Sequence, residues 1–501
     1  MAEIVEGKIY LYPTRTIIEP YLERNSRIEN SLSVWNEVTY SYDFQAFIKD
    51  SANNRLIIPN TYTNYELQSM YPNYKIVDER KKCEDYMKAN KSIKEIKMNF
   101  GCRDEIQEKV MKYLNHSSKL DKYKSMQKYL GLDTGFGKTF CAVKYIVDNK
   151  ERPIIFVDQE SLALQWKDRI TKYTDTKPDE IYYISGKPSV DKLMNMSNEE
   201  ILNIKFFICC YRTLTINIKN TGSSSNISDL FNKIRITLKV FDEAHVEYVS
   251  IFKMDMISNL KSLYLSATPK RSDVKEDKVY QNIFKTVKIL KMEELVGTKE
   301  NYHNIAVYKW NSKPNLLEEN ACSTKYGFSM AKYCSYLENK KYDEFEERIY
   351  KILFETILAN RKKKKTAILF GTLSLLDKFY DNLIQYCKDQ NYKLVINKFT
   401  GNTAKEDKLK ILDETDIIIT TEKSFSKGMD VKNLKVLINT VPFSSDTKLT
   451  QVVGRLRQIP GKNVIFVDLN DIGFGAIRNQ LYSKTNKVYK KLNKNLFIYD
   501  I

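Results

Sequence analysis

The strongest constraint on the fold is an alternation, along most of the chain, of short apolar runs with amphipathic stretches. In the first half of the chain these runs are Tyr129–Leu132, Ile154–Val157, Phe206–Cys209, Val240–Phe241 and Ser262–Leu265. In the second half they are Ala367–Phe370, Lys393–Ile396, Ile417–Ile419, Val436–Ile438 and Val464–Val467. Continuous apolar strands separated by helices are typical of parallel sheets that helices cover on both faces. The sequence therefore predicts an α/β fold with two parallel-sheet lobes in tandem.

The regions around these runs indicate the domain organisation. Residues 1–92 contain Lys8–Tyr12 and Arg55–Pro59, where aromatic and β-branched residues alternate with polar ones, as in short strands. We expect a small N-terminal α/β accessory domain here, followed by a charged helix through Arg80–Lys82. The first lobe is predicted at residues 93–290. Residues 291–501 are predicted to hold a linker, a less regular stretch over 291–345, and the second lobe.

The composition points to a polyanionic partner. The 501 residues include 81 Lys and Arg against 63 Asp and Glu, a net charge of +18. Such a surplus suits phosphate contacts with nucleic acid, while the competing interpretation is compositional drift in a chain rich in Lys, Asn, Ile and Tyr. Eight cysteines without a CxxC pair and only three histidines argue against a structural zinc or iron–sulfur site.

Hydropathy gives an expectation about the compartment. The chain has no apolar run of membrane-spanning length, and the start Met1-Ala2-Glu3 is unlike a signal peptide. We expect a soluble, cytoplasmic protein with reduced cysteines and no membrane partner.

The segment Asp133-Thr134-Gly135-Phe136-Gly137-Lys138-Thr139 follows an apolar run and precedes a helix-like stretch. Glycines at these positions let backbone N–H groups turn toward a phosphate, and the helix N-terminus adds positive potential. Lys138 is expected to reach the β- and γ-phosphates of ATP, and Thr139 to be a ligand of Mg²⁺. The alternative is a glycine-rich turn with an unrelated lysine, which the strand–loop–helix context disfavours.

Two further motifs follow apolar runs in the first lobe. Asp242 and Glu243 follow Phe241, where Asp242 can hold Mg²⁺ through its hydration shell and Glu243 can activate the attacking water. We expect His245 to couple the nucleotide to the second lobe rather than to bind a metal. Ser266-Ala267-Thr268-Pro269 closes the next run and could relay the nucleotide state. Either motif alone would be ordinary, and the phosphate loop upstream favours the functional interpretation.

These motifs, together with Gln451-Val452-Val453-Gly454-Arg455-Leu456-Arg457, resemble in order and spacing those of superfamily 2 helicases and translocases. The resemblance covers about residues 93 to 480 and implies two tandem RecA-like lobes that hydrolyse ATP with Mg²⁺. Ser426–Leu434 and Asp468–Asp471 resemble the T4-type phage helicase family that remodels recombination branches, and the related repair and transcription helicases. By that analogy the N-terminal domain recognises branched or distorted DNA.

The resemblance also implies roles for residues outside the phosphate loop. Arg103 and Gln107, four apart on one face of an expected helix, would contact adenine, with Gln107 as the base reader. Thr421 to Gly428 and Asp430 resemble the motif that touches both backbone phosphate and nucleotide. Gln451, Gly454 and Arg455 match the motif that supplies an arginine to the γ-phosphate when the lobes close. A second arginine is usual where this chain has Gln458, so the role of Arg457 stays open.

Several residues after the apolar runs are expected to contact the nucleic-acid backbone, which positions a strand without reading its sequence. They are Ser161, Gln165, Arg212 and Thr213 in the first lobe, and Gly371, Thr372, Thr400, Gly401 and Thr421 in the second. Trp166 is better interpreted as a core residue. Arg361–Lys365 is a helix-terminal basic cap or a phosphate patch. The lysines between Lys484 and Lys494 form a basic aromatic surface or one face of a terminal helix.

The function predicted is ATP-dependent unwinding or remodelling of DNA, rather than RNA, in replication, recombination or repair, in a phage or DNA virus. Replication, recombination or transcription proteins are expected partners. The alternatives are an RNA helicase, a transcript-release factor or duplex translocase, a restriction-enzyme motor subunit, and a nucleotide-gated clamp that barely hydrolyses ATP. Retention of Lys138, Glu243 and Arg455 argues against the clamp.

Overall fold

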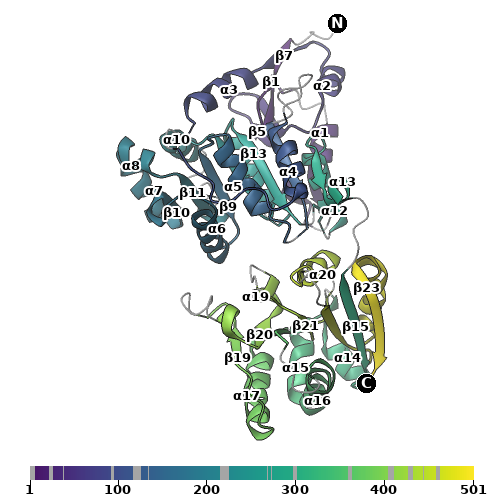
Figure 1. Ribbon diagram of the computed structural model, residues 1–501. Coiled ribbons are helices and arrows are strands. Elements are labelled where there is room, and N and C mark those ends of the chain that lie inside the picture. The colour runs from purple at the N-terminus through teal and green to yellow at the C-terminus, as the bar shows by residue number, and fades with distance from the viewer. Residues whose placement is uncertain are drawn as a thin grey trace. The chain divides into compact units, whose positions relative to one another are not determined.

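The structure, a computed structural model, describes residues 6–21, 26–37, 39–91, 95–116, 126–133, 135–214, 225–246, 248–267, 269–271, 273–296, 302–325, 327–358, 364–403, 411–426, 431, 433–443, 445–457 and 463–501. The chain divides into two compact units, residues 1–297 and 298–501 (Figure 1). The predicted boundary at 92 falls on residues outside the described ranges. The predicted domain limits therefore stay a prediction.

The first unit is built around a parallel sheet of seven strands in the order β10-β11-β9-β12-β13-β8-β14. In that order the strands are Ile181–Ile184, Phe206–Cys210, Pro153–Val157, Leu238–Phe241, Lys261–Ser266, Gln127–Gly131 and Ile289–Lys291. Alternate residues of each strand enter opposite core clusters: Phe156 packs in one cluster and Ile155 in the other. Both faces of the sheet are therefore buried, which explains why its strands are apolar throughout.

The second unit repeats this architecture with seven parallel strands in the order β19-β20-β18-β21-β22-β15-β23. In that order they are Ile396–Phe399, Ile417–Thr421, Thr366–Phe370, Val436–Asn439, Val464–Asp471, His303–Trp310 and Asn493–Asp500. Its two faces also belong to separate clusters, with Ile368 in one and Leu369 in the other. A two-stranded hairpin, β16 (Ser323–Thr324) with β17 (Gly327–Phe328), lies outside this sheet.

The N-terminal residues form a smaller mixed sheet in the order β5-β6-β2-β1-β7. These strands are Ile48–Asp50, Arg55–Pro59, Arg15–Glu19, Gly7–Leu11 and Tyr74–Asp78, and a hairpin of β3 (Ser33–Asn36) and β4 (Ser41–Gln45) accompanies them. Strand β1 is antiparallel to β2 and parallel to β7. Two parallel-sheet lobes and a small N-terminal α/β domain confirm the predicted fold class.

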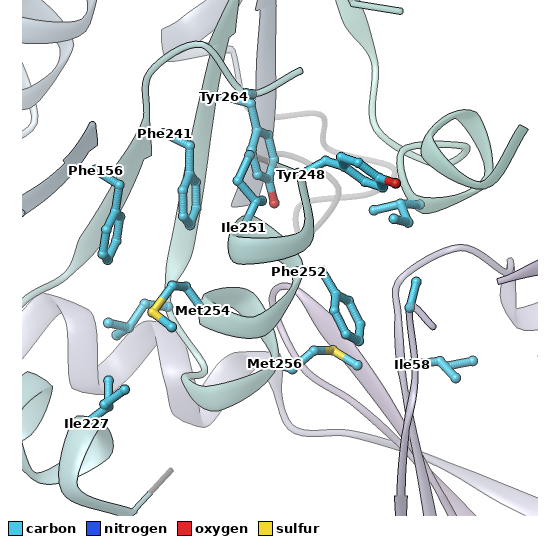
Figure 2. Packing of buried hydrophobic residues seen from close by; sticks show 14 of the residues in the cluster. Ile58, Phe156, Ile227, Phe241, Tyr248, Ile251, Phe252, Met254, Met256 and Tyr264 are labelled. Atoms are coloured by element: carbon cyan, nitrogen blue, oxygen red, sulfur yellow. The ribbon is translucent and has the colours of Figure 1, made fainter. Parts of the chain in front are cut away.

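Helix α11 (Tyr248–Ile257) connects the small sheet to the large sheet of the first unit. Phe156, Phe241 and Tyr264 form a stack of aromatic rings on the large sheet, with centroids 5.0 and 5.5 Å apart. Figure 2 shows α11 between this row and Ile58 of β6, with Phe252 on the side of Ile58. The small sheet and the large sheet thus share one hydrophobic core.

The helices of the first unit are α1 (Ser26–Ser31), α2 (Asn64–Met70), α3 (Arg80–Ala89), α4 (Glu105–Asn115), α5 (Lys138–Asp148), α6 (Glu160–Tyr173), η2 (Pro178–Glu180), α7 (Gly186–Asn195), α8 (Asn198–Asn203), α10 (Ser225–Ile234), α11, α12 (Val274–Ile283) and α13 (Met292–Val296). Those of the second are α14 (Leu316–Ala321), α15 (Met330–Lys340), α16 (Tyr342–Tyr350), η3 (Lys351–Ile357), α17 (Leu373–Asp389), α19 (Glu422–Ser426), α20 (Asp446–Val453), α21 (Gly475–Lys484), η5 (Thr485–Tyr489) and α22 (Lys490–Leu492). None of the described helices is long and apolar enough to cross a membrane.

The structure corrects three local predictions. The stretch 291–345, expected to be irregular, contains β15 and the helices α14 and α15. The strand predicted at Lys393–Ile396 is β19, which begins at Ile396 and ends at Phe399. The prediction was therefore placed three residues too early. Of the lysines assigned to a basic surface or a terminal helix, Lys484 to Lys491 lie in α21, η5 and α22, whereas Lys494 lies in the edge strand β23 beside β15.

Candidate functional site

The phosphate-loop residues lie between β8 and α5, at the carboxyl edge of the first sheet. Gly135 and Gly137 have φ values of 84° and 87°, a left-handed conformation that favours glycine. Gly137 is the N-cap of α5, and a Cβ on it would lie 2.5 Å from Gln107 Nε2. Glycine is therefore required at 137 both by conformation and by space. Phe136 is half-buried here, and Thr134 lies outside the described residues.

Lys138 and Thr139 begin α5. Lys138 Nζ donates to the carbonyl oxygens of Leu132, at 2.7 Å, and Asp133, at 3.2 Å, so the ammonium group stays against the loop. The buried Thr139 hydroxyl accepts a hydrogen bond from the guanidinium of Arg169 at 2.9 Å. A cation, a hydroxyl and the backbone N–H groups of a helix N-terminus are thus gathered where a phosphate would bind.

Gln107 lies beside this loop. Its side chain is buried, its Oε1 accepts from the backbone N–H of Arg103 at 2.8 Å, and its Nε2 is 3.5 Å from the carbonyl oxygen of Phe136. Asp104 is the N-cap of α4, so Arg103 precedes the helix, and the expectation of a shared helix face was wrong. The Arg103 side chain is exposed and pairs with Asp104 at 2.9 Å. Gln107 and Arg103 still meet, through the Arg103 backbone.

Asp242 and Glu243 follow β12 at the same edge. The Asp242 carboxylate accepts from the indole N–H of Trp166 at 2.8 Å and from the backbone N–H of Glu243 at 3.1 Å. Burial and the neighbouring Glu243 carboxylate raise the pKa of Asp242. Glu243 itself has a φ of 48°, and its buried Oε2 makes no hydrogen bond within the described part of the chain. Two adjacent carboxylates held in this way gain stability from a nearby cation.

His245 joins this motif to the end of β13. Its Nδ1 lies 2.8 Å from the Ser266 hydroxyl and 3.5 Å from Glu243 Oε2. Burial, with the charges of Arg271 and Lys138, lowers the pKa of His245 to about 3, so the imidazole is neutral near pH 7. The predicted Ser266 motif therefore does contact the Asp242–His245 segment. Its Thr268 lies outside the described residues.

The arrangement fits a nucleoside triphosphate with Mg²⁺. Lys138 and the N-terminus of α5 offer positive charge to phosphates, and the Thr139 hydroxyl and Asp242 carboxylate offer the oxygen ligands that Mg²⁺ prefers. The left-handed turn at Gly137, which leaves no room for a side chain, allows a close backbone approach. No group of three or more His, Cys, Asp or Glu side chains in the described ranges could hold another metal.

The residues predicted to contact nucleic acid in the first lobe follow β9 and β11. Ser161 and Gln165 are half-buried on α6, and Arg212 is exposed after β11. The Thr213 hydroxyl accepts from the backbone N–H of Gly186 at 3.1 Å, which ties it to the start of α7. Because parallel strands end at one edge, these residues share that edge with the phosphate loop.

In the second lobe, Gly371 and Thr372 follow β18, Thr400 and Gly401 follow β19, and Thr421 ends β20. Thr372 is the N-cap of α17, and Thr421 accepts from the backbone N–H of Ser424 at 3.2 Å. These hydroxyl groups therefore also have local structural roles. All five of these residues lie at the carboxyl edge of this sheet, because each ends or follows one of its parallel strands. Gly428 and Asp430 lie outside the described residues.

The arginine motif of the second lobe follows α20. Gln451 is on α20, Gly454 is its C-cap, and Arg455 is half-buried while Arg457 is exposed. The next residue, Leu456, is buried, and its carbonyl oxygen lies 3.0 Å from Nε2 of His303 on β15. Strand β15 thus fixes the turn that carries Arg455.

Three residues at the nucleotide site were not recognised from sequence. Trp166 is 1% exposed, as its core interpretation predicted, but it also hydrogen bonds to Asp242. Arg169, one turn later on α6, contacts Thr139. Arg271 donates to the carbonyl oxygen of His245 at 2.6 Å and lies over the Tyr248 ring. The i, i+3 spacing of Trp166 and Arg169 was the available signal, but it also suits an ordinary amphipathic helix.

Comparison with known families agrees with this site. Residues 100–271 match the family model described as type III restriction enzyme, res subunit. The match spans the phosphate loop, Asp242–His245 and Ser266, and it supports a superfamily 2 helicase. Among curated protein sequences, no significant match to the chain was found.

Solved structures of helicases and restriction motors resemble the chain at low identity. T4 UvsW is 15% identical over 99% of each chain, with a TM-score of 0.36. Dbp5 of S. cerevisiae, solved with RNA and ADP BeF3, is 14% identical over 79% of this chain and 89% of its own, with a TM-score of 0.47. An HsdR fragment from Vibrio vulnificus is 12% identical over 79% and 72%, with a TM-score of 0.48.

Proposed function

We propose that this protein is an ATP-dependent superfamily 2 DNA helicase or translocase that remodels replication, recombination or repair intermediates. The observation that carries the proposal is the convergence of Lys138, Thr139, Asp242 and Glu243 at one edge of the first sheet. Trp166 and Arg169 of α6 link this group by hydrogen bonds to Asp242 and Thr139. An isolated glycine-rich turn would not place a half-buried acid pair beside it.

Each side chain has a role in the proposed hydrolysis. Lys138 binds the β- and γ-phosphates, and Thr139 and Asp242 hold Mg²⁺, which neutralises the charge that develops on the phosphates. Glu243 orients the attacking water and takes up its proton, a task suited to a carboxylate whose buried Oε2 has no hydrogen-bonding partner among the residues that the structure describes. Gln107 contacts the base, and Arg455 stabilises the γ-phosphoryl group.

DNA is the proposed polymer, with RNA as the alternative. The net charge of +18 favours binding to a polyanion. The hydroxyl, amide and glycine residues at the carboxyl edges of both sheets are proposed to contact backbone phosphates without reading bases. Cycles of ATP binding and hydrolysis are proposed to move the two lobes against each other and so to advance them along the strand.

The test is ATP hydrolysis measured without nucleic acid and with single-stranded DNA, duplex, a four-way junction and RNA. We expect stimulation by single-stranded or branched DNA. Glu243→Gln should lower the stimulated rate by at least about 100-fold, because it removes the general base. Glu108→Gln, an exposed glutamate of α4, is the matched control and should keep the wild-type rate.

Each other outcome changes the proposal. Stimulation by RNA alone would assign the protein to RNA motors. Nucleic-acid binding with no stimulation by any polymer would leave only a nucleotide-gated clamp.

A further inference from the structure

A cavity of about 440 Å³ lies in the first unit, where the N-terminal residues meet the first lobe. Its walls come from the turn before β2, from α3, from α10 and from the residues that follow α11. None of the residues that line it belongs to the nucleotide site, and its volume falls in the range of small-molecule pockets.

Three polar atoms in this wall are buried without a hydrogen-bond partner among the described residues: Arg15 Nε, Ser258 Oγ and Asn259 Oδ1. Ser258 is 91% buried as a residue, since its exposed fraction is 9%. One of the three atoms is a donor, one is an acceptor and the hydroxyl can be either. Buried polar groups in folded proteins are almost always paired, so three on one wall indicate that something else supplies the partners.

The remaining wall is aromatic and apolar. Tyr12, Tyr86 and Phe231 line the cavity together with Ile257 and Leu260. The Arg15 guanidinium lies 5.2 Å from the centre of the Tyr12 ring and also donates to the carbonyl oxygen of Met256. Tyr86 is 36% exposed and therefore lies at the opening. Flat aromatic walls favour a flat ligand that can stack on them.

The residues that line the cavity carry a weakly positive net charge. Arg15 and Lys82 are cationic, and Glu79 is the acid among the lining residues, so the sum is +1. Lys82 pairs with Glu79 at 2.8 Å, and the Lys82 side chain is 79% exposed. Arg15 is the cation that this pair leaves uncompensated, while Lys82 is the exposed cation that a phosphate outside the cavity can approach.

We propose that this cavity binds a nucleobase. A base stacks on Tyr12, Tyr86 or Phe231 and hydrogen bonds with the polar side chains of Asn259 and Arg15. Its sugar and phosphate face Lys82. The base comes either from a free nucleotide or from an unpaired position of the nucleic acid that the motor remodels. The choice of a base among flat heterocycles rests on the proposed function.

The test is photo-crosslinking of the full chain to single-stranded DNA that carries 5-iodouracil, with ADP saturating the ATP site. Peptide mapping should find crosslinks at Tyr12, Tyr86 or Phe231. Tyr86→Leu and Asn259→Leu should each lower the yield at these residues by at least about fivefold, since base stacking and a buried hydrogen bond are lost. Tyr482→Leu, at an exposed tyrosine of the second unit, is the matched control and should keep the yield.

Competition by excess uridine monophosphate separates the two sources. If it abolishes the cavity crosslinks, the cavity takes a free nucleotide in preference to a base of the strand, and if it leaves them unchanged, the cavity takes a base of the strand. Crosslinks confined to other residues, with yields unaffected by both variants, would overturn the proposal. Stimulated ATP hydrolysis is measured on the same variants without ADP, so loss of the cavity site is distinguished from failure of the motor function.

Discussion

At the scale of single residues, the candidate metal ligand Asp242 is held from one side by the indole of Trp166. That N–H donates to the carboxylate at 2.8 Å, while Arg169 donates to the other candidate ligand, Thr139, at 2.9 Å. Both donors lie on α6, so one helix orients both oxygen ligands. Substitution of groups that orient metal ligands in this way typically lowers metal affinity about 10- to 100-fold.

Replacing Trp166 by Phe tests this orientation. The substitution keeps an aromatic ring in the core but removes the N–H that Asp242 accepts. We expect the Mg²⁺ concentration for half-maximal ATP hydrolysis to rise about tenfold or more. The measurement is a Mg²⁺ titration of ATPase activity at saturating ATP.

The matched control is Trp310→Phe, at a tryptophan 2% exposed in the core of the second unit. It should leave the Mg²⁺ dependence unchanged. An unaltered Mg²⁺ dependence in Trp166→Phe would show that the indole only fills space.

The positions of the Gly135–Thr139 loop, of the acid pair and of Gln107 relative to the strands and helices could be predicted, because each follows or precedes a recognisable element. It could not show that Trp166 is both a core residue and a donor to Asp242, since burial and hydrogen bonding depend on the partner strand. It also placed Arg103 inside the helix. The side chain of Asp104 accepts from the backbone N–H of Gln107 and so caps α4, which begins at Glu105. Arg103 therefore lies outside the helix.

At the scale of elements, a buried polar cluster holds the C-terminal segment on the second sheet. The Asp468 carboxylate of β22 accepts from Lys484 at 2.8 Å, from Tyr489 at 2.6 Å and from Asn439 at 2.7 Å. Asp468, Lys484 and Tyr489 are all buried. The cluster joins β21 and β22 to α21 and η5, which lead to the edge strand β23.

Lys484→Met should therefore destabilise the second unit. It leaves the Asp468 charge buried without its cation, and loss of one partner of a buried ion pair costs about 3 to 5 kcal/mol. Urea unfolding followed by circular dichroism measures the change in the free energy of unfolding. Lys487→Met, an exposed lysine 3.7 Å from Asp446, should change it by less than about 1 kcal/mol. Equal effects of the two substitutions would contradict the role of the cluster.

Strand β8 carries a second buried lysine. Lys128 Nζ donates to the carbonyl oxygens of Tyr113 and His116, both at 2.9 Å, at the C-terminal end of α4. Burial, with the charge of Lys261, lowers the pKa of Lys128 from 10.5 to about 8. Between these values the unfolded chain binds more protons than the folded one, so this group makes stability rise as pH rises.

We expect Lys128 to add up to about 3 kcal/mol to the free energy of unfolding between pH 8 and pH 10.5. The measurement is chemical unfolding at several pH values for the wild type and Lys128→Met. The wild type should gain stability relative to the variant across this interval. A constant difference between the two would show that Lys128 is charged in the folded state throughout.

The sequence did not predict β15 and β23, because neither strand shows the unbroken apolar pattern of a buried central strand. β15 contains His303, Asn304 and Lys309, which break its apolar pattern although it lies between β22 and β23. β23 is an exposed edge strand whose residues are mostly solvent-facing, so its sequence lacks the signal of a buried strand. Central apolar strands, by contrast, were found within a few residues of their observed bounds.

At the scale of the whole molecule, the chain consists of two units that each have core clusters on both faces of a seven-stranded parallel sheet. The phosphate loop and acid pair belong to the first unit, and Arg455 belongs to the second. The small N-terminal sheet shares its core with the first lobe through α11. In the proposed function, hydrolysis depends on both lobes. This requires the phosphate loop and the acid pair on one unit and the arginine on the other.

The most direct test of the proposed motor is to measure ATP binding and DNA-stimulated ATP hydrolysis in Arg455→Ala, with Arg457→Ala in parallel. Arg478→Ala, at an arginine of α21 that donates to the Ile472 carbonyl oxygen, is the control. If Arg455 serves the γ-phosphoryl group, ATP affinity should stay within about threefold of the wild type. Hydrolysis should then fall by about 1000-fold or more. Wild-type hydrolysis in Arg455→Ala and in Arg457→Ala would contradict a two-lobed ATPase.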